Sequence, residues 1–157
     1  MATQVQAVPS NRRLDEIDLH LLAALRANAR ISQEDLSRIL ALSRPAVRER
    51  MRRLETLGIL RGYTTIVDWE SLGYPILAFV SVRTSMGTCE EGTRVVNSFS
   101  CDSAVVEECY AITGDWCLFA KVRARTSKDL AAFLDEIKRN PRFSGTSTTL
   151  ALGTVSS

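Results

Sequence analysis

Residues 31–62, ISQEDLSRILALSRPAVRERMRRLETLGILRG, decide the fold of the first half of this chain. Ser32 and Ser43 each precede an apolar-periodic stretch and suit the N-cap position of a helix. Ile31 and Leu42 stand just before these caps, where they can pack as hydrophobic staples. Only two residues separate the apolar end of the first helix from Ser43. Two short helices joined by so tight a turn predict a helix-turn-helix unit.

A further helix is predicted just upstream of this unit. Asp15 is a good N-cap there, and Leu14 can pack onto Leu19 one turn later. Asn28 and Gly58 are the predicted left-handed ends of the first and third helices. Residues 14–62 are therefore predicted to form a helix-turn-helix domain of the winged-helix-like kind, with double-stranded DNA as its partner.

The helix that follows Ser43 carries five arginines and one acid in ten residues. At about 100° per residue, Val47, Met51 and Leu54 cluster on one side, and the arginines occupy the opposite face and its flanks. The second helix of a helix-turn-helix unit enters the major groove, where arginine binds a guanine edge or a phosphate. The alternative is a solvated charged face, which most surface helices have. The predicted DNA-binding residues are Ser43, Arg44, Arg48, Arg50, Arg52 and Arg53.

Charge is unevenly distributed, although the net charge is only +2. Residues 1–62 hold 11 arginines and 7 acids, a net +4, and residues 63–157 carry a net −2. A basic front half suits a polyanion-binding domain attached to a body with another role. No stretch approaches the about 18 apolar residues of a membrane helix, and residues 1–13 lack a secretory pattern. We therefore expect a cytoplasmic protein with no membrane partner and a flexible tail at residues 1–13.

The cysteines do not indicate a metal site. Cys89, Cys101, Cys109 and Cys117 form no CxxC pair, and the one histidine, His20, is far away in the sequence. We therefore expect reduced thiols, no metal and no cofactor.

The pattern changes after a predicted hinge strand and linker at residues 63–73. Residues 74–157 are predicted to form a second domain with the order β-α-β-β-α-β. This is the ferredoxin-like arrangement, an antiparallel sheet with two helices on one face, so the whole chain belongs to the α+β class. The uncovered face predicts pairing with a second copy, which makes the protein at least a homodimer. The predicted strands are Ile76–Arg83, Val105–Thr113, Trp116–Arg123 and Phe143–Leu152, and the predicted helices are Thr88–Phe99 and Ser127–Asn140.

Gly114 and Asp115 are predicted to be a two-residue hairpin turn. Opposed residues of the two flanking strands then have numbers that sum to 229. In that register Cys109 and Cys117 point to opposite sides of the sheet and cannot form a disulfide.

Four stretches resemble the leucine-responsive regulatory protein/AsnC (Lrp/AsnC, or feast-famine) family: LDEIDLHLLAAL from Leu14, the block from Arg30 to Tyr63, DWESLGY from Asp68 and ECYAITGDW from Glu108. The resemblance extends from about Leu14 to Leu152. It implies a transcription regulator that forms dimers through the hinge strand and the sheet, and commonly octamers. It also implies that residues 74–157 are a ligand-binding and oligomerisation domain, with a small ligand, usually an amino acid, bound between dimers. Carried over by position, the effector-binding candidates are Gly114, Asp115, Trp116, Cys117, Thr146 and Thr148.

One position departs from the family pattern. Many relatives have Gly-Asp-x-Asp in this hairpin, and here Cys117 stands at the second aspartate. A carboxylate there would be a natural partner for an α-ammonium group. Three alternatives follow: the ligand differs, Asp115 and backbone carbonyls replace the lost contact, or the hairpin is a plain turn and there is no effector.

Two other classes of function fit the sequence less well. An enzyme is disfavoured because the sequence offers one histidine, no Ser-His-Asp set and no phosphate-binding loop. The other alternative is a ligand-binding or assembly protein with no effector-dependent DNA switching. It would leave the arginine-rich helix without a regulated role.

Overall fold

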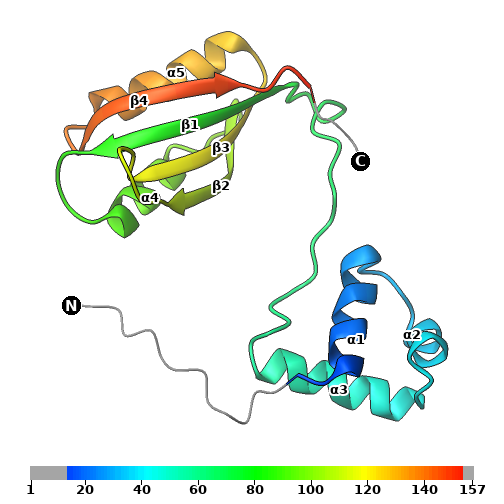
Figure 1. The fold of residues 1–157 in the computed structure, drawn as a ribbon. Helices are drawn as coiled ribbons and strands as arrows, with labels where there is room; N and C mark the ends of the chain where they lie inside the picture. The colour runs from blue at the N-terminus through cyan, green and yellow to red at the C-terminus, as the bar shows by residue number, and fades with distance from the viewer. Residues whose placement is uncertain (1–13, 154–157) are drawn as a thin grey trace. The chain divides into compact units, whose positions relative to one another are not determined.

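The computed structural model describes residues 14–153, and the tail predicted at residues 1–13 lies outside them. The chain divides into two compact units, with the division between Ile66 and Val67. Figure 1 shows helices alone in the first unit and a sheet with helices in the second. The α+β class predicted from the sequence is confirmed.

The first unit contains the three predicted helices. Asp15, Ser32 and Ser43 are their N-caps, as predicted, and each side chain accepts a hydrogen bond from a backbone N–H in the first turn. Asp15 and Asp18 together form a complete capping box. The helices are α1 Glu16–Ala27, α2 Gln33–Leu40 and α3 Arg44–Thr56.

The helix ends differ in part from the prediction. Gly58 has a positive φ of 66°, as predicted, but Asn28 is extended, with φ −148°. The left-handed residue of the tight turn is instead Ala41, with φ 50°. Ser37 holds this turn closed, since its hydroxyl donates to the Leu42 carbonyl and its carbonyl accepts from the Leu42 N–H at 3.0 Å. These two bonds offset the strain of a left-handed alanine.

A small leucine-rich core joins the three helices. Its members come from every helix and are 0–6 % exposed: Leu21, Leu25, Leu36, Val47 and Leu54. Burial of each such side chain contributes about 1.5–3 kcal/mol, so a few residues supply most of the apolar stabilisation of this unit.

The predicted hinge strand is not a strand in the single chain. Residues 61–68 are irregular, and Ile66 is fully exposed. No strand lies between Leu57 and Pro75, so the wing implied by a winged-helix-like domain is also missing from this stretch. A strand satisfies its N–H and C=O groups on a neighbouring backbone, and the rest of residues 14–153 does not supply one here.

The second unit has the predicted ferredoxin-like arrangement. Its four antiparallel strands lie in the order β2-β3-β1-β4. Its helix α5 starts at Ser127, as predicted, and is capped by Thr126, because the Thr126 hydroxyl accepts from the Asp129 N–H at 3.1 Å. The elements are β1 Ile76–Thr84, α4 Cys89–Ser98, β2 Ala104–Ala111, β3 Leu118–Ala124, α5 Ser127–Arg139 and β4 Phe143–Leu150.

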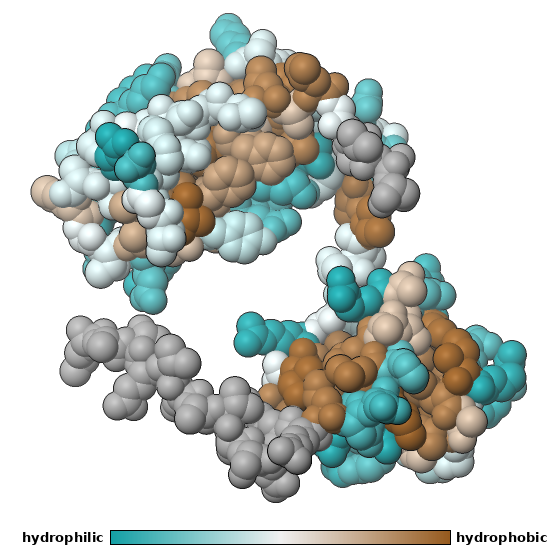
Figure 2. Space-filling model, in the orientation of Figure 1, coloured by the Kyte–Doolittle hydropathy of each residue, from teal (hydrophilic) through white to brown (hydrophobic). Residues whose placement is uncertain are grey.

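One face of the sheet is covered and the other is open. Figure 1 shows α4 and α5 on the same side. The even-numbered residues of β1 and β3 face this side and are buried against Val96, Phe133 and Ile137. On the open face the rings of Phe79 and Phe119 stack at a centroid distance of 5.6 Å and are only half-buried. Figure 2 shows apolar surface crossing this face of the sheet.

The β2–β3 register is the one predicted. The sum of 229 holds from Glu108–Lys121 to Ala111–Leu118, and a bulge at Glu107 then shifts it by one residue. The Ile112 N–H also donates to the Cys117 carbonyl at 2.9 Å. The regular strands stop short of this bond, since β2 ends at Ala111 and β3 begins at Leu118, so the connection is longer than the predicted two-residue turn.

The predicted orientation of the two cysteines is wrong. Cys109 and Cys117 both lie on the helix side, since Cys109 pairs with Ala120, which is buried under the helices, and Cys117 accepts from Thr84. Cys117 lies before the start of β3, and its N–H donates to the Val82 carbonyl. Strict strand alternation therefore does not extend to it.

One buried carboxylate connects α1 to α3. Asp18 is 0 % exposed, and it accepts hydrogen bonds from Arg53 and, at 2.8 Å, from Arg50. Arg50 also reaches Asp15 at 2.6 Å. The capping N–H of Asp18 and the Arg50 guanidinium lower the pKa of Asp15. A carboxylate removed from water requires such partners.

Replacing this carboxylate is expected to weaken the first unit strongly. An Asp18→Ala substitution leaves two arginines without their shared partner and should lower the free energy of unfolding by about 3 kcal/mol. Glu49→Ala is the matched control, because it breaks an exposed pair with Arg52 and should cost less than about 1 kcal/mol. Urea denaturation followed by circular dichroism measures both, and equal losses would contradict a structural role for Asp18.

Candidate DNA-binding surface and effector site

Helix α3 presents its polar face because its apolar face is anchored. Val47 and Leu54 are 0 % exposed, and Met51 is half-buried beside them. The Ser43 hydroxyl accepts from the Ala46 N–H at 3.4 Å, so this predicted DNA-binding residue also caps the helix. The N-terminal end of α3 and its outer face are therefore fixed as one rigid surface.

The arginines of α3 fall into two groups. Arg50 and Arg53 point toward α1, where their guanidinium groups form ion pairs with the buried Asp18. Arg44 pairs with Glu34 at 2.6 Å, and Arg52 pairs with Glu49 at 2.8 Å. The side chains of both these pairs are more than half exposed.

Arg44, Arg48 and Arg52 are the arginines placed to meet an external anion. Arg48 is exposed and pairs with no acid among residues 14–153. Exposed ion pairs such as those of Arg44 and Arg52 contribute only about 0–1 kcal/mol, so a phosphate can displace their partners at little cost. Sequence periodicity could not separate these residues from Arg50 and Arg53, because Asp18 lies more than 30 positions away.

The hairpin residues are held by Arg83, which sequence reasoning missed. Arg83 Nε donates to the Asp115 carbonyl at 3.0 Å, and its guanidinium lies 4.8 Å from the centroid of the Trp116 ring. Gly114 adopts φ +108°, a conformation that favours glycine. Arg83 follows the buried Val82 on β1, so strand alternation places it on the open face of the sheet. This alternation is the sequence signal that could have identified Arg83. Asp115 and Trp116 are thus tied to the open side of the sheet.

The other effector candidates lie elsewhere. Thr146 and Thr148 pair with Val82 and Val80, whose side chains face the helices. Paired residues share a face, so these threonines lie on the helix side, across β1 from the hairpin. The thiol of Cys117 also lies on that side, with Thr84. The six candidates therefore divide between two faces and do not form one cluster.

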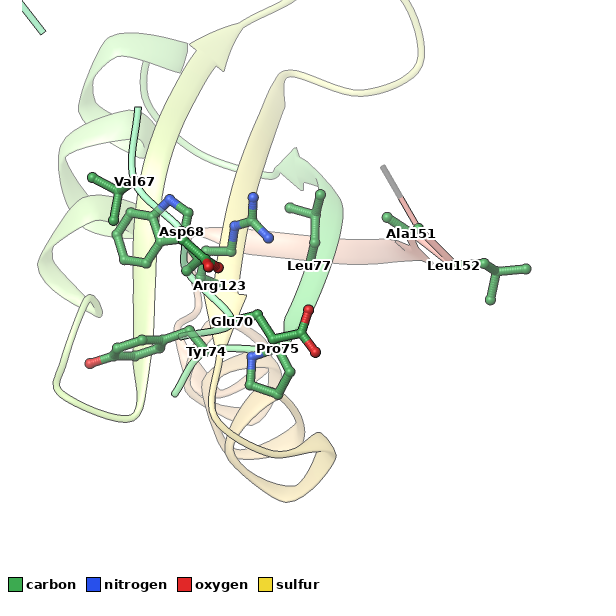
Figure 3. Close-up of a pocket in the computed structure, with 11 residues that line it drawn as sticks. Val67, Asp68, Glu70, Tyr74, Pro75, Leu77, Arg123, Ala151 and Leu152 are labelled. Carbon is green, nitrogen blue, oxygen red and sulfur yellow. The ribbon is translucent and has the colours of Figure 1, made fainter. Parts of the chain in front are cut away.

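A separate hollow of about 400 Å³ lies in the second unit, near the start of β1. Figure 3 shows Glu70, Tyr74 and Arg123 among the residues around it. Arg123 is paired with Glu107 at 3.0 Å, and its guanidinium lies 5.9 Å from the centroid of the Trp69 ring. The hollow offers charges of both signs and was not predicted from the sequence.

Among residues 14–153 no helix is long and apolar enough to cross a membrane. Within those residues no three histidine, cysteine or acidic side chains gather as potential metal ligands.

Comparison with known proteins matches both units. Residues 14–55 match the AsnC-type helix-turn-helix domain, and residues 77–157 match the Lrp/AsnC ligand binding domain. The HTH-type transcriptional regulator FL11 of Pyrococcus horikoshii is 34 % identical over 141 residues, covering 90 % of this chain and 91 % of that protein. The leucine-responsive regulatory protein of Haemophilus influenzae is 32 % identical, covering 72 % of this chain and 68 % of its own length.

Solved structures agree with these matches. The structure of LrpC from B. subtilis has a TM-score of 0.75 at 30 % identity, covering 92 % of this chain and 98 % of that one. These relatives are transcription regulators and not enzymes. The chain therefore belongs to the Lrp/AsnC family of transcription regulators, with an AsnC-type helix-turn-helix domain followed by an Lrp/AsnC ligand-binding domain.

Proposed function

We propose that this protein binds specific DNA sequences as a homo-oligomer and that a small ligand, an amino acid or a related metabolite, modulates its assembly or DNA affinity. The observation that carries the proposal is the outer face of α3, where Arg44, Arg48 and Arg52 are exposed opposite a buried apolar stripe. A DNA-binding regulator must be in the same compartment as the chromosome, so we propose that this protein is cytoplasmic.

We assign the DNA contacts to the arginines of α3 that are not bound to Asp18. A guanidinium can bind a guanine edge or a phosphate through two parallel hydrogen bonds, provided it is not already committed to a buried carboxylate. Arg48 and Arg52 lie one turn apart on the same side of α3 and meet this condition. Ser43 and Arg44, at the start of α3, stand where a helix N-terminus meets a phosphate. Arg50 and Arg53 support binding indirectly, by holding α3 to α1.

Removal of the two central arginines should weaken DNA binding without unfolding the protein. The Arg48→Ala, Arg52→Ala variant should lower the salt dependence by about one unit per lost phosphate contact, and a lost base contact should cost about 1–3 kcal/mol at one operator position. The control is Lys138→Ala, Arg139→Ala, which removes the same charge from exposed positions of α5. Gel-shift titration at several salt concentrations compares them. Unchanged affinity in the α3 variant would remove the assignment.

Two features support assembly into dimers. The open face of the sheet carries the half-buried Phe79–Phe119 stack, which a second sheet could cover. The exposed residues Tyr63 and Ile66 lie in the irregular hinge, which a second backbone could convert into the predicted strand. Further association of dimers would give the octamer that the family resemblance implies.

A charge placed in the open face should prevent this association. Phe79→Glu puts a carboxylate where the second sheet is proposed to pack, whereas Lys128→Glu changes an exposed residue of α5 and serves as the control. Light scattering should give at least twice the chain mass of 17.4 kDa for the wild type and the control, and a lower mass for Phe79→Glu. A wild-type mass of one chain would contradict the proposal.

The effector proposal rests on the hairpin. Asp115 can bind an ammonium group, and backbone groups of the left-handed Gly114 turn can serve the other end of a zwitterion. Cys117 supplies no carboxylate, so Asp115 carries the whole charge-assisted contact. Trp116 offers apolar surface, and Thr146 and Thr148 could join only from an adjoining copy or after a rearrangement. The name of the leucine-responsive relative supports an amino acid as the class of ligand.

Loss of the Asp115 charge should lower the affinity of the protein for its ligand. Isothermal titration of the twenty amino acids into the full chain identifies the ligand, and Asp115→Asn should then reduce its affinity about tenfold, the cost of about one charged hydrogen bond. Asp135→Asn, at an exposed position of α5, should not. If binding is equally lost on Arg123→Gln, the hollow beside Tyr74 is the site instead.

The absence of any amino-acid response would favour the second candidate function. In that case the hairpin is a structural turn, and the protein assembles and binds DNA with no effector-dependent switching. Cys117 in place of the second family aspartate is the observation that keeps this candidate open.

A further inference from the structure

Two of the four cysteines meet beneath the hairpin. Cys89 is the first residue of α4, and Cys117 is the last residue before β3. Both are partly exposed, and both pack against the hydrophobic core of the second unit. They are 28 positions apart in the sequence, so no spacing motif indicates the pair.

Packing of the first turn of α4 brings the thiols together. A Cβ placed on Gly92 would lie 3.0 Å from Leu118 Cδ1 and 3.2 Å from Thr84 Cγ2, so α4 rests directly on these two residues. Cys89 precedes Gly92 by three positions and lies on the same helix face. Cys117 adjoins Leu118, and its sulfur accepts from the Thr84 hydroxyl at 3.1 Å. The two thiols are close enough for each to shift the pKa of the other.

The two thiols differ in acidity. The hydroxyl and backbone N–H of Thr84, the Cys89 thiol and the nearby Arg83 charge lower the pKa of Cys117. Burial is the main cause that raises the pKa of Cys89, and its contact with Cys117 adds to it. Since the thiolate is the nucleophile, Cys117 is the sulfur that reacts first, and Cys89 is placed to react with the product.

We propose that Cys89 and Cys117 are a peroxide-sensitive thiol pair that closes to an intramolecular disulfide. The Cys117 thiolate attacks one oxygen of a hydroperoxide, the O–O bond breaks, and the leaving oxygen takes up a proton, which leaves a sulfenic acid. The Cys89 sulfur then attacks the sulfenic sulfur, the S–O bond breaks, and water leaves with the Cys89 proton. Two thiols and one hydrogen peroxide thus become one disulfide and two waters.

The bridge would act on the hairpin that carries Asp115 and Trp116. In the reduced chain, the Cys117 backbone bonds to Ile112 on one side and Val82 on the other. A disulfide requires Cα atoms about 4.4–6.8 Å apart and a fixed dihedral angle, so closure ties the hairpin to the start of α4. This inference does not depend on the proposed effector, because the reaction needs no bound ligand.

The other two cysteines provide internal comparisons. Cys101 is exposed and bonds to Ser103, so it would react with peroxide but has no thiol in that contact. Burial raises the pKa of Cys109, and the nearby Thr93 hydroxyl only partly offsets this. Cys109 should therefore stay reduced while the pair reacts.

The test uses the full chain with Cys101→Ser, titrated with hydrogen peroxide and analysed by non-reducing peptide mapping. Two of the three remaining thiols should disappear, and a peptide linking Cys89 to Cys117 should appear. Cys117→Ser should slow oxidation of Cys89 about tenfold or more, since the reactive thiolate is gone. Cys89→Ser should leave a sulfenic acid on Cys117 that dimedone traps.

A second readout follows the hairpin itself. In a Trp69→Phe background Trp116 is the remaining tryptophan, and its fluorescence should change on oxidation and return with reductant. The proposal is overturned if Cys109 oxidises as readily as the pair, or if Cys89 and Cys117 reach higher oxidation states with no linked peptide.

Discussion

The buried carboxylate of Asp18 is the constraint on which the first unit depends. It has no exposed surface, so its charge is tolerable only with cationic partners at hydrogen-bonding distance. Arg50 and Arg53 supply them from α3. The ion cluster fixes the rotation of α3 about its axis and, with it, the direction in which Arg48 and Arg52 point. A basic face of few residues thereby becomes a rigid surface.

The second unit follows from a different constraint, the one-sided cover of its sheet. Both helices lie on the face of the even-numbered β1 and β3 residues, and the Phe79–Phe119 stack is left on the other face. The same geometry determines where the hairpin residues lie, because Arg83 on the open face contacts both Asp115 and Trp116. The thiol of Cys117 falls on the opposite side. The hairpin thus joins two chemically distinct surfaces.

Local signals in the sequence predicted most of the fold. Caps such as Ser43 set helix starts, and the hairpin turn set the β2–β3 register, because both depend on residues a few positions apart. Features that depend on distant partners were not predictable in this way. Arg53 and its partner Asp18 are 35 positions apart in the sequence. Cys117 does not follow the strand alternation, and its thiol contacts Thr84 on the helix side. The predicted hinge strand is irregular because no backbone among residues 14–153 pairs with it. Thr146 was named as a candidate through its family position alone.

The central claim is that α3 reads DNA sequence from a symmetric assembly. Sequencing of the DNA recovered after binding of the full chain to a random pool tests it most directly. The account predicts enriched half-sites related by twofold symmetry, with centres about 10–10.5 base pairs or a multiple of that apart. Recovered DNA with the same sequence composition as the starting pool, in low salt and in moderate salt alike, would contradict it.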